Sequence, residues 1–204
     1  MSSTGCATAR RCRAEVTLRA ETTEVVAAVQ QVMARFAALE LHAARGGREV
    51  MRALNETVRL SPAQDLPALA SDLLAAVDAL LSVMPAYAPP LNVMHRVLAH
   101  LEVAQTAGDS ADTFRAVIEW DTAEFESWSE SARRKIAEIG AECIPDGSTI
   151  FTFTLSETAL RTLHRAAEQG KRFRVLVTES RPNHDGLHTA RELAKAGVEV
   201  KVSL

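Results

Sequence analysis

The last third of the chain alternates short β-prone runs with helical segments, and this alternation limits the possible fold more than any other feature. The runs read TIFTFT over 149–154, KRFRVLVTE over 171–179 and VEVKVSL over 198–204. Their β-branched and aromatic residues suit strands, and strands that alternate with helices form βαβαβ units with a parallel sheet. Because such connections are right-handed, the C-terminal ends of the strands meet at one edge, where parallel sheets bind ligands.

Capping residues mark the two helices of this segment. Ser156 is a suitable N-cap with Glu157 in the first turn, Gly170 suits the C-cap, and Gly197 ends the second helix. The third strand runs to Leu204, and three parallel strands leave an exposed edge. We therefore expect that the sheet is truncated at its C-terminus or is completed by a partner chain.

The preceding residues show only helical periodicity. Gly46–Gly47 interrupts the pattern and predicts a helix break, and 111–140 predicts one long helix. Its expected apolar set is Phe114, Val117, Ile118, Phe125, Trp128, Ile136 and Ile139. The predicted fold is therefore an α/β protein with a disordered tail over 1–14, an all-helical domain over 15–142 and a partial Rossmann-like domain over 143–204.

Composition excludes several classes of protein. The formal charge of −3 does not favour direct binding to nucleic acid, and we find no run of about 18 apolar residues that predicts a membrane span. Cys6, Cys12 and Cys143 show no zinc spacing, and their odd number favours the reducing cytoplasm. The six histidines are scattered, so we assign no metal and no cofactor.

Two stretches near the predicted C-terminal edge of the sheet contain candidate binding residues. Thr154, Ser156 and the free N–H groups of the following helix could hold a phosphate, although Ser156 could equally act only as a cap. Glu179, Arg181 and Asp185 follow the second strand, where loops often carry binding residues. Glu179 could instead simply pair with Arg181 or a neighbour.

A third candidate lies in the helical half. Arg45 is followed by Gly46 and a second glycine, which suits close approach of the backbone to an anion, or a helix break with a solvated arginine. The chain contains no GxxxxGK[ST], GxGxxG, GxSxG or HExxH motif, so none of these motifs indicates a reaction.

The order of motifs after residue 140 resembles one known family. Asp146–Gly147 precedes a strand that ends at 152–156, and Thr178–Pro182, TESRP, ends the second strand before Gly186 opens a helix. This pattern resembles the family that unites the α, β and δ subunits of translation initiation factor 2B with two isomerases. These act on ribose 1,5-bisphosphate and on methylthioribose 1-phosphate. The resemblance covers about residues 15–204 in layout and 140–204 in detail.

The resemblance implies a catalytic pair in the isomerases, a cysteine at the end of the first strand and an aspartate after the third. Here Thr154 occupies the cysteine position, Phe153 replaces a preceding histidine, and the aspartate would follow Leu204. A threonine hydroxyl does not ionise readily near neutral pH and cannot replace a thiol in acid–base chemistry. We therefore assign no catalytic residue.

The helical half matches the family in part. Arg45 and Gly46 fall on the phosphate-contacting Arg-Gly segment of the family. In a second binding segment, Met84 replaces the family's arginine, while Pro85 and Asn92 remain. Losing one such arginine removes a charge-assisted contact worth about 1.5–3 kcal/mol.

These observations predict a non-catalytic regulatory or binding protein, similar to initiation factor 2B, with a residual pocket for a sugar phosphate or nucleotide phosphate. The alternative is an aldose–ketose isomerase acting on ribose 1,5-bisphosphate or a related sugar phosphate. The resemblance implies self-association, or association with a related subunit, through the α/β domain. We expect a cytoplasmic protein that binds neither a membrane nor nucleic acid directly.

Overall fold

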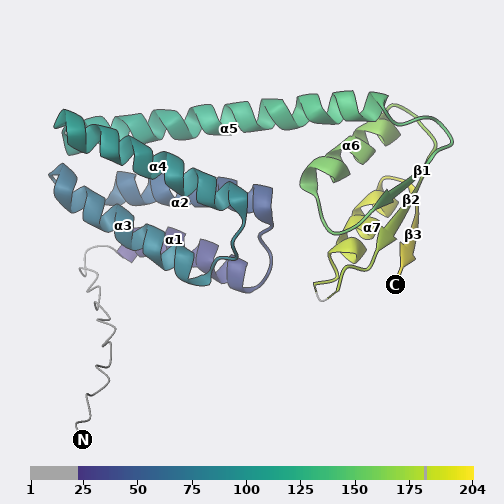
Figure 1. The fold of residues 1–204 in the computed structure, drawn as a ribbon, viewed down its shortest axis with the longest axis horizontal. Helices are drawn as coiled ribbons and strands as arrows, with labels where there is room; N and C mark the ends of the chain where they lie inside the picture. Colours follow the sequence, from purple (N-terminus) through teal and green to yellow (C-terminus); the bar gives the residue numbers. More distant parts are fainter. Residues whose placement is uncertain (1–22, 182) are drawn as a thin grey trace, which may run out of the picture.

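The computed structural model describes residues 23–181 and 183–204 (Figure 1). The predicted tail over 1–14 lies outside the described residues. The chain forms α1 (Thr23–Ala37), α2 (Ala43–Leu60), α3 (Leu66–Val83), α4 (Ala88–Ala107), α5 (Ala111–Glu142), β1 (Thr149–Thr152), α6 (Glu157–Glu168), β2 (Arg174–Thr178), α7 (Asp185–Lys195) and β3 (Glu199–Ser203). A mostly helical α/β protein with a small parallel sheet is thereby confirmed, while the predicted domain boundaries and the truncation stay predictions.

Helices α1–α4 and the first half of α5 form a bundle around one apolar core (Figure 1). Side chains at the helix ends explain where several of these helices begin. The N–H of Ala68 donates to Asp65 Oδ1 at the start of α3, and the N–H of Thr113 donates to Ser110 Oγ at the start of α5. Each bond satisfies one donor that a first helical turn leaves unpaired.

The predicted helix break at Gly46–Gly47 is wrong, because both glycines lie inside α2. A Cβ atom on Gly46 would lie 2.8 Å from Phe36 Cζ, and one on Gly47 would lie 3.2 Å from the backbone of Pro89. The glycines therefore let α2 approach α1 and α4 closely. A glycine pair in a sequence can indicate either a break or close packing, and here packing is the reason.

The predicted long helix is confirmed as α5, which runs from the bundle to the sheet (Figure 1). Its predicted apolar set is only partly buried. Phe114 and Ile118 lie in the bundle core, whereas Trp128, Ile136 and Ile139 are 49–68% exposed. The second half of α5 leaves the bundle, so its apolar residues lose the neighbours that periodicity alone assumes.

The sheet has the order β1–β2–β3, and both pairs are parallel. Val175 is buried beside Leu163 of α6 and Leu193 of α7, so both helices pack against the same face. Right-handed crossovers that proceed in one direction along a sheet place their helices on one face in this way. Phe151 lies on the other face and is 66% exposed.

Helix α3 corrects the expectation that no segment is long and apolar enough to span a membrane. With a mean hydropathy of 1.7 over Leu66–Val83, it is long and apolar enough to cross a membrane by length and composition. One of its faces packs in the bundle core, and Asp72 on α3 accepts a hydrogen bond from Ser61 Oγ at 2.6 Å. Core helices of soluble proteins pass the same test of length and composition, so α3 is weak evidence for a membrane span.

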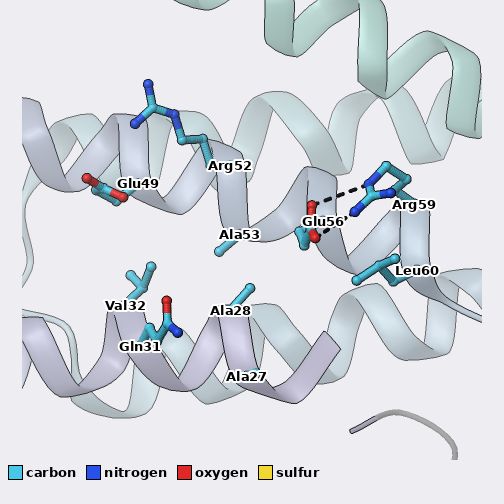
Figure 2. Close-up of a pocket in the computed structure, with 10 residues that line it drawn as sticks. All are labelled: Ala27, Ala28, Gln31, Val32, Glu49, Arg52, Ala53, Glu56, Arg59 and Leu60. Carbon is cyan, nitrogen blue, oxygen red and sulfur yellow. Dashed lines mark hydrogen bonds and ion pairs between the residues drawn. The ribbon is translucent and has the colours of Figure 1, made fainter. Parts of the chain in front are cut away.

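A groove of about 500 Å³ lies between α1 and α2 (Figure 2). Two of its arginines are paired, one with another lining residue and one with a residue outside the groove. Arg59 Nη2 donates to Glu56 Oε1 at 2.7 Å, and Arg52 Nε donates to Glu126 Oε1 at 2.5 Å. The candidate binding residues from the sequence do not line this groove: Arg45, Gly46, Thr154, Ser156, Glu179 and Arg181.

Candidate functional site

A cleft of about 870 Å³ separates the bundle from the α/β part of the chain. Its polar lining residues from the bundle are Arg35, Glu40, His42, Arg45 and Arg48, and those from the α/β part are Ser156, Glu157, Thr158, Asn183, His184, Asp185 and His188. The positive charges of the three arginines equal the negative charges of the three carboxylates when the histidines are neutral. The sign of the local potential therefore depends on how the individual side chains are paired and on the helices that end here.

The N-termini of three helices meet at this cleft. Helix α2 begins after His42, α6 after Ser156 and α7 after His184, and all three of these N-cap residues line the cleft. The N-terminus of a helix carries unpaired N–H donors and a partial positive charge, which together favour anions. Three such ends around one cleft make an oxyanion the ligand that this geometry favours.

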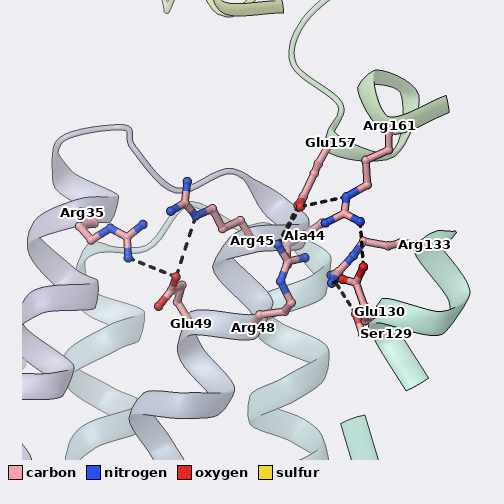
Figure 3. Close-up of polar contacts among 10 residues, drawn as sticks. All are labelled: Arg35, Ala44, Arg45, Arg48, Glu49, Ser129, Glu130, Arg133, Glu157 and Arg161. Atoms are coloured by element: carbon pink, nitrogen blue, oxygen red, sulfur yellow. Dashed lines mark hydrogen bonds and ion pairs between the residues drawn. The ribbon is translucent and has the colours of Figure 1, made fainter. Parts of the chain in front are cut away.

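Two arginines from the first turns of α2 reach the cleft and differ in how firmly they are held (Figure 3). Arg48 is 13% exposed, and its Nη2 donates to both carboxylate oxygens of Glu157, at 2.8 and 2.9 Å. Arg45 is 57% exposed, and its Nε lies 3.9 Å from Glu49 Oε1, too far for a strong hydrogen bond. Arg45 is therefore the more available cation for a ligand.

Glu157 belongs to a chain of charged residues that joins α2, α6 and α5 (Figure 3). Arg161 lies 3.7 Å from Glu157 and donates to Glu130 Oε1 at 2.9 Å, and Glu130 also accepts from Arg133. Hydrogen bonds from Arg133 and Arg161 lower the pKa of Glu130 to about 2. This network of ion pairs holds α6, and hence one wall of the cleft, against the bundle.

The loops after β1 and β2 hold three residues in the left-handed backbone region. Thr154, Ser180 and His184 have φ of 57°, 60° and 57°. The Thr154 N–H donates to Ser180 Oγ at 2.8 Å, and Thr154 Oγ1 donates to Asp185 Oδ2 at 3.2 Å. Non-glycine residues adopt this conformation at a cost, which these bonds offset, and such residues concentrate at functional sites.

Glu179 and Arg181 bond to each other, as one of the two readings of the sequence predicted. Arg181 Nε donates to Glu179 Oε2 at 2.6 Å, and this bond is the main reason that the pKa of Glu179 is lowered. Neither residue lines the cleft, but Glu179 Oε1 lies 2.9 Å from Nδ1 of His184, which does. Glu179 therefore orients a lining residue, and Arg181 lies outside the cleft.

The other predicted residues differ in how they relate to the cleft. Arg45 and Ser156 line the cleft, and the Ala159 N–H donates to Ser156 Oγ at 3.3 Å, so Ser156 is also a cap. Thr154 contacts the lining residue Asp185. Gly46 faces Phe36, and its N–H donates to His42 O at 2.6 Å, so that donor is already engaged.

Sequence reasoning missed Arg48 and His188 as lining residues, and it named Asp185 only as part of the loop after the second strand. Arg48 lies one helical turn after Arg45, and that spacing was the available signal. Asp185 and His188 fall on the first turn of α7, and only the packing of that helix against β2 brings them to the cleft. Within residues 23–181 and 183–204, no group of three His, Cys, Asp or Glu side chains could hold a metal ion.

Residues 42–204 match the model of the initiation factor 2 subunit family. The chain belongs to this family. It is 37% identical over 125 residues to the ribose 1,5-bisphosphate isomerase of Archaeoglobus fulgidus, which covers 61% of this chain and 38% of that protein. The crystal structure of the Pyrococcus horikoshii translation initiation factor eIF-2B superposes with a TM-score of 0.65 at 27% identity, covering 88% of this chain and 58% of that chain.

A subunit of the tetrameric eIF2B-β2δ2 complex from C. thermophilum also has this fold. Its TM-score is 0.67 at 19% identity, and the match covers 88% of this chain and 60% of that chain. The chain therefore spans between about two fifths and three fifths of the length of these relatives. The family and the fold are shown, and the names of the relatives include both isomerases and initiation-factor subunits.

Proposed function

We propose that this chain is a non-catalytic member of the initiation factor 2 subunit family that binds a small phosphorylated ligand in the cleft. The convergence of the N-termini of α2, α6 and α7 carries the proposal, because the partial positive charges of three helix ends meet at one volume. Arg45 adds a loosely held cation at the same place. A sugar phosphate or nucleotide phosphate supplies the matching charge.

The chemistry of Thr154 supports a binding role rather than a catalytic one. Thr154 occupies the position at which the resemblance places the catalytic cysteine of the isomerases. Its hydroxyl donates to Asp185, and a hydroxyl is a far weaker acid than a thiol. Ser156 and the N-terminus of α6 still provide donors for an anion, so the anion-binding half of the site remains.

A titration with ribose 1,5-bisphosphate, followed by calorimetry, tests the binding role. Arg45→Ala should weaken the affinity by about 10- to 100-fold, since a charge-assisted hydrogen bond contributes about 1.5–3 kcal/mol. Arg52→Ala is a matched control, because Arg52 lies on the same helix, is 56% exposed and does not line the cleft. Equal affinities for both variants and the parent would contradict this site.

The alternative function is an aldose–ketose isomerase, and two observations favour it. Relatives of this chain are named ribose 1,5-bisphosphate isomerase, and the Thr154–Asp185 contact places a carboxylate at the cleft. A carboxylate within reach of a sugar carbon can transfer protons. Turnover of ribose 1,5-bisphosphate above background, lost in Asp185→Asn, would refute the non-catalytic proposal.

We also propose that the α/β part associates with a second copy or a related subunit. Phe151 pairs with Leu176 of β2 on the uncovered face of the sheet and is 66% exposed, and Phe153, just after β1, is 65% exposed. Exposed apolar surface of this kind marks contact sites. Light scattering should show an oligomer that Phe151→Ser dissociates. A parent protein that remains monomeric across the concentrations tested would oppose the idea.

The remaining expectations are part of the same proposal. We propose a cytoplasmic protein that needs no cofactor and binds neither a membrane nor nucleic acid directly, consistent with its net charge of −3. Sedimentation with anionic vesicles and with duplex DNA should leave the protein in the supernatant at physiological salt. Retention by either one would overturn the corresponding statement.

A further inference from the structure

A second pocket of about 450 Å³ lies beside the cleft, on the other side of Arg48. It lies between α2, α4, α5 and the first turn of α6, and its charged and aromatic lining residues are Arg48, Arg96, Phe125, Trp128 and Arg133. The function proposed above uses only the cleft and assigns nothing to this pocket. Its arginines line the pocket, whereas the carboxylates that pair with them do not.

Among the described residues, every charged side chain that lines the pocket is an arginine. Each of these arginines is anchored by a carboxylate that does not line it: Arg48 by Glu157, Arg96 by Asp121, and Arg133 by Glu130. Arg96 binds Asp121 with two nitrogens, Nε at 2.8 Å and Nη2 at 2.5 Å, and Asp121 is almost fully buried. The carboxylates hold the guanidinium groups in place without entering the pocket, so the pocket itself is receptive to an anion.

Arg133 adds an unsatisfied donor. Its side chain is 11% exposed, Nη1 donates to Ser129 Oγ at 3.1 Å, and Nη2 donates to Glu130 (Figure 3). Its Nε is buried and has no acceptor among residues 23–181 and 183–204. A buried donor without an acceptor is costly, so a small turn of this guanidinium toward an entering oxygen would gain a hydrogen bond that the empty pocket lacks.

The rest of the wall is apolar and aromatic. Trp128 is 68% exposed, and Phe125 is partly buried, with the guanidinium carbon of Arg96 6.0 Å from the centre of its ring. Pro89 and Val93 complete the apolar side. A flat ring can stack on an indole or between aromatic and guanidinium planes, which is a common way to hold planar ligands.

We propose that this pocket binds a planar aromatic ring that carries a phosphate or carboxylate group. The ring stacks on Trp128, and the anion meets the N–H groups of Arg96 and Arg133. The site is separate from the cleft and, among the described residues, shares with it only Ala44, Arg48 and Thr158. Binding here therefore need not involve Arg45 or Asp185.

The two tryptophans of the chain allow a direct test with phenyl phosphate as the probe. Trp120 and Trp128 both lie on α5 and are 64% and 68% exposed, but only Trp128 lines the pocket. Phenyl phosphate should change the fluorescence of Trp120→Phe in a saturable way, because Trp128 is then the only indole. It should leave the fluorescence of Trp128→Phe unchanged. An equal response from both variants, or no saturable response from Trp128, would overturn the proposal.

Affinity measured by calorimetry separates the parts of the proposed ligand and the two pockets. Inorganic phosphate and phenol should each bind at least tenfold more weakly than phenyl phosphate, and Trp128→Ala should weaken phenyl phosphate by a similar factor. Arg133→Gln should also weaken it, whereas Arg52→Ala, which lines neither the cleft nor this pocket, should not. Equal binding of phenol and phenyl phosphate, or equal losses in Arg52→Ala and Arg133→Gln, would refute an anion-specific site at this pocket.

Discussion

Replacing Gly186 by alanine tests how the packing of α7 builds the cleft. A Cβ atom on Gly186 would lie 1.7 Å from the backbone oxygen of Thr178 at the end of β2. Atoms in ordinary contact are 3.4–4 Å apart, so the first turn of α7 must move by roughly 1.5 Å or more. Because the obstacle is backbone rather than a side chain, no rotamer change can relieve it.

The expected cost follows from this displacement and from the bonds that it breaks. Overpacking costs about 1–3 kcal/mol, and each lost hydrogen bond costs about 1 kcal/mol. Two bonds depend on the first turn of α7: Gly186 N–H donates to Glu179 O at 3.3 Å, and Thr154 Oγ1 donates to Asp185 Oδ2 at 3.2 Å. We therefore expect Gly186→Ala to lower the free energy of unfolding by about 3–5 kcal/mol.

Equilibrium unfolding in urea, followed by circular dichroism, measures this change. With an m-value of about 2 kcal/mol/M, the midpoint should fall by about 1.5–2.5 M. Gly170→Ala is the control, because Gly170 has φ of 78° but nothing within 4 Å of an added Cβ. It should cost only the backbone strain of about 1–2 kcal/mol.

Binding gives a second readout for the same pair of variants. Gly186→Ala should weaken binding of ribose 1,5-bisphosphate, since it moves His184 and Asp185 at the cleft, whereas Gly170→Ala should not. The reasoning fails if Gly186→Ala loses no more stability than Gly170→Ala. It also fails if the Gly186→Ala protein binds the ligand as the parent does.

Three further predictions concern charged groups. Lys171 Nζ donates to Ala141 O at 2.6 Å and to Ile144 O at 2.8 Å, so Lys171→Met should cost about 1.5–3 kcal/mol in urea unfolding, and an unchanged midpoint would contradict this cap. The hydrogen bond from Arg96 lowers the pKa of Asp121, so its stabilisation is present above the unfolded pKa of about 3.9 and is lost as pH falls through the lower folded pKa. The melting temperature of the parent should therefore fall below about pH 4 more steeply than that of Asp121→Asn. The pKa of Glu130 is lowered to about 2, so its ion pairs also lose their stabilisation as the pH falls from the unfolded pKa of about 4.3 to 2. The melting temperature of Glu130→Gln should therefore fall less steeply than that of the parent over this pH range. Parallel plots of melting temperature against pH for parent and variant would count against the ion pairs.

Local chemistry predicted much of the fold. Ser156 caps α6 as expected, and the β-branched runs form three parallel strands, because capping and β-propensity act over a few residues. The predicted first strand was too long, since β1 ends at Thr152 and Thr154 adopts left-handed φ to bond Ser180. That bond joins loops 26 residues apart, and local propensity cannot predict it.

The sequence by itself determined that this chain has a helical region followed by βαβαβ units, and it predicted Arg45 and Ser156 as candidate contacts for an anion. Only the tertiary structure decided that three helix N-termini share one cleft and that Gly46 packs against Phe36. It also decided that three arginines surround a second pocket while their carboxylates lie outside it. The reason is physical: periodicity and capping depend on neighbours along the chain, whereas a site depends on which helix ends meet after the apolar faces have packed.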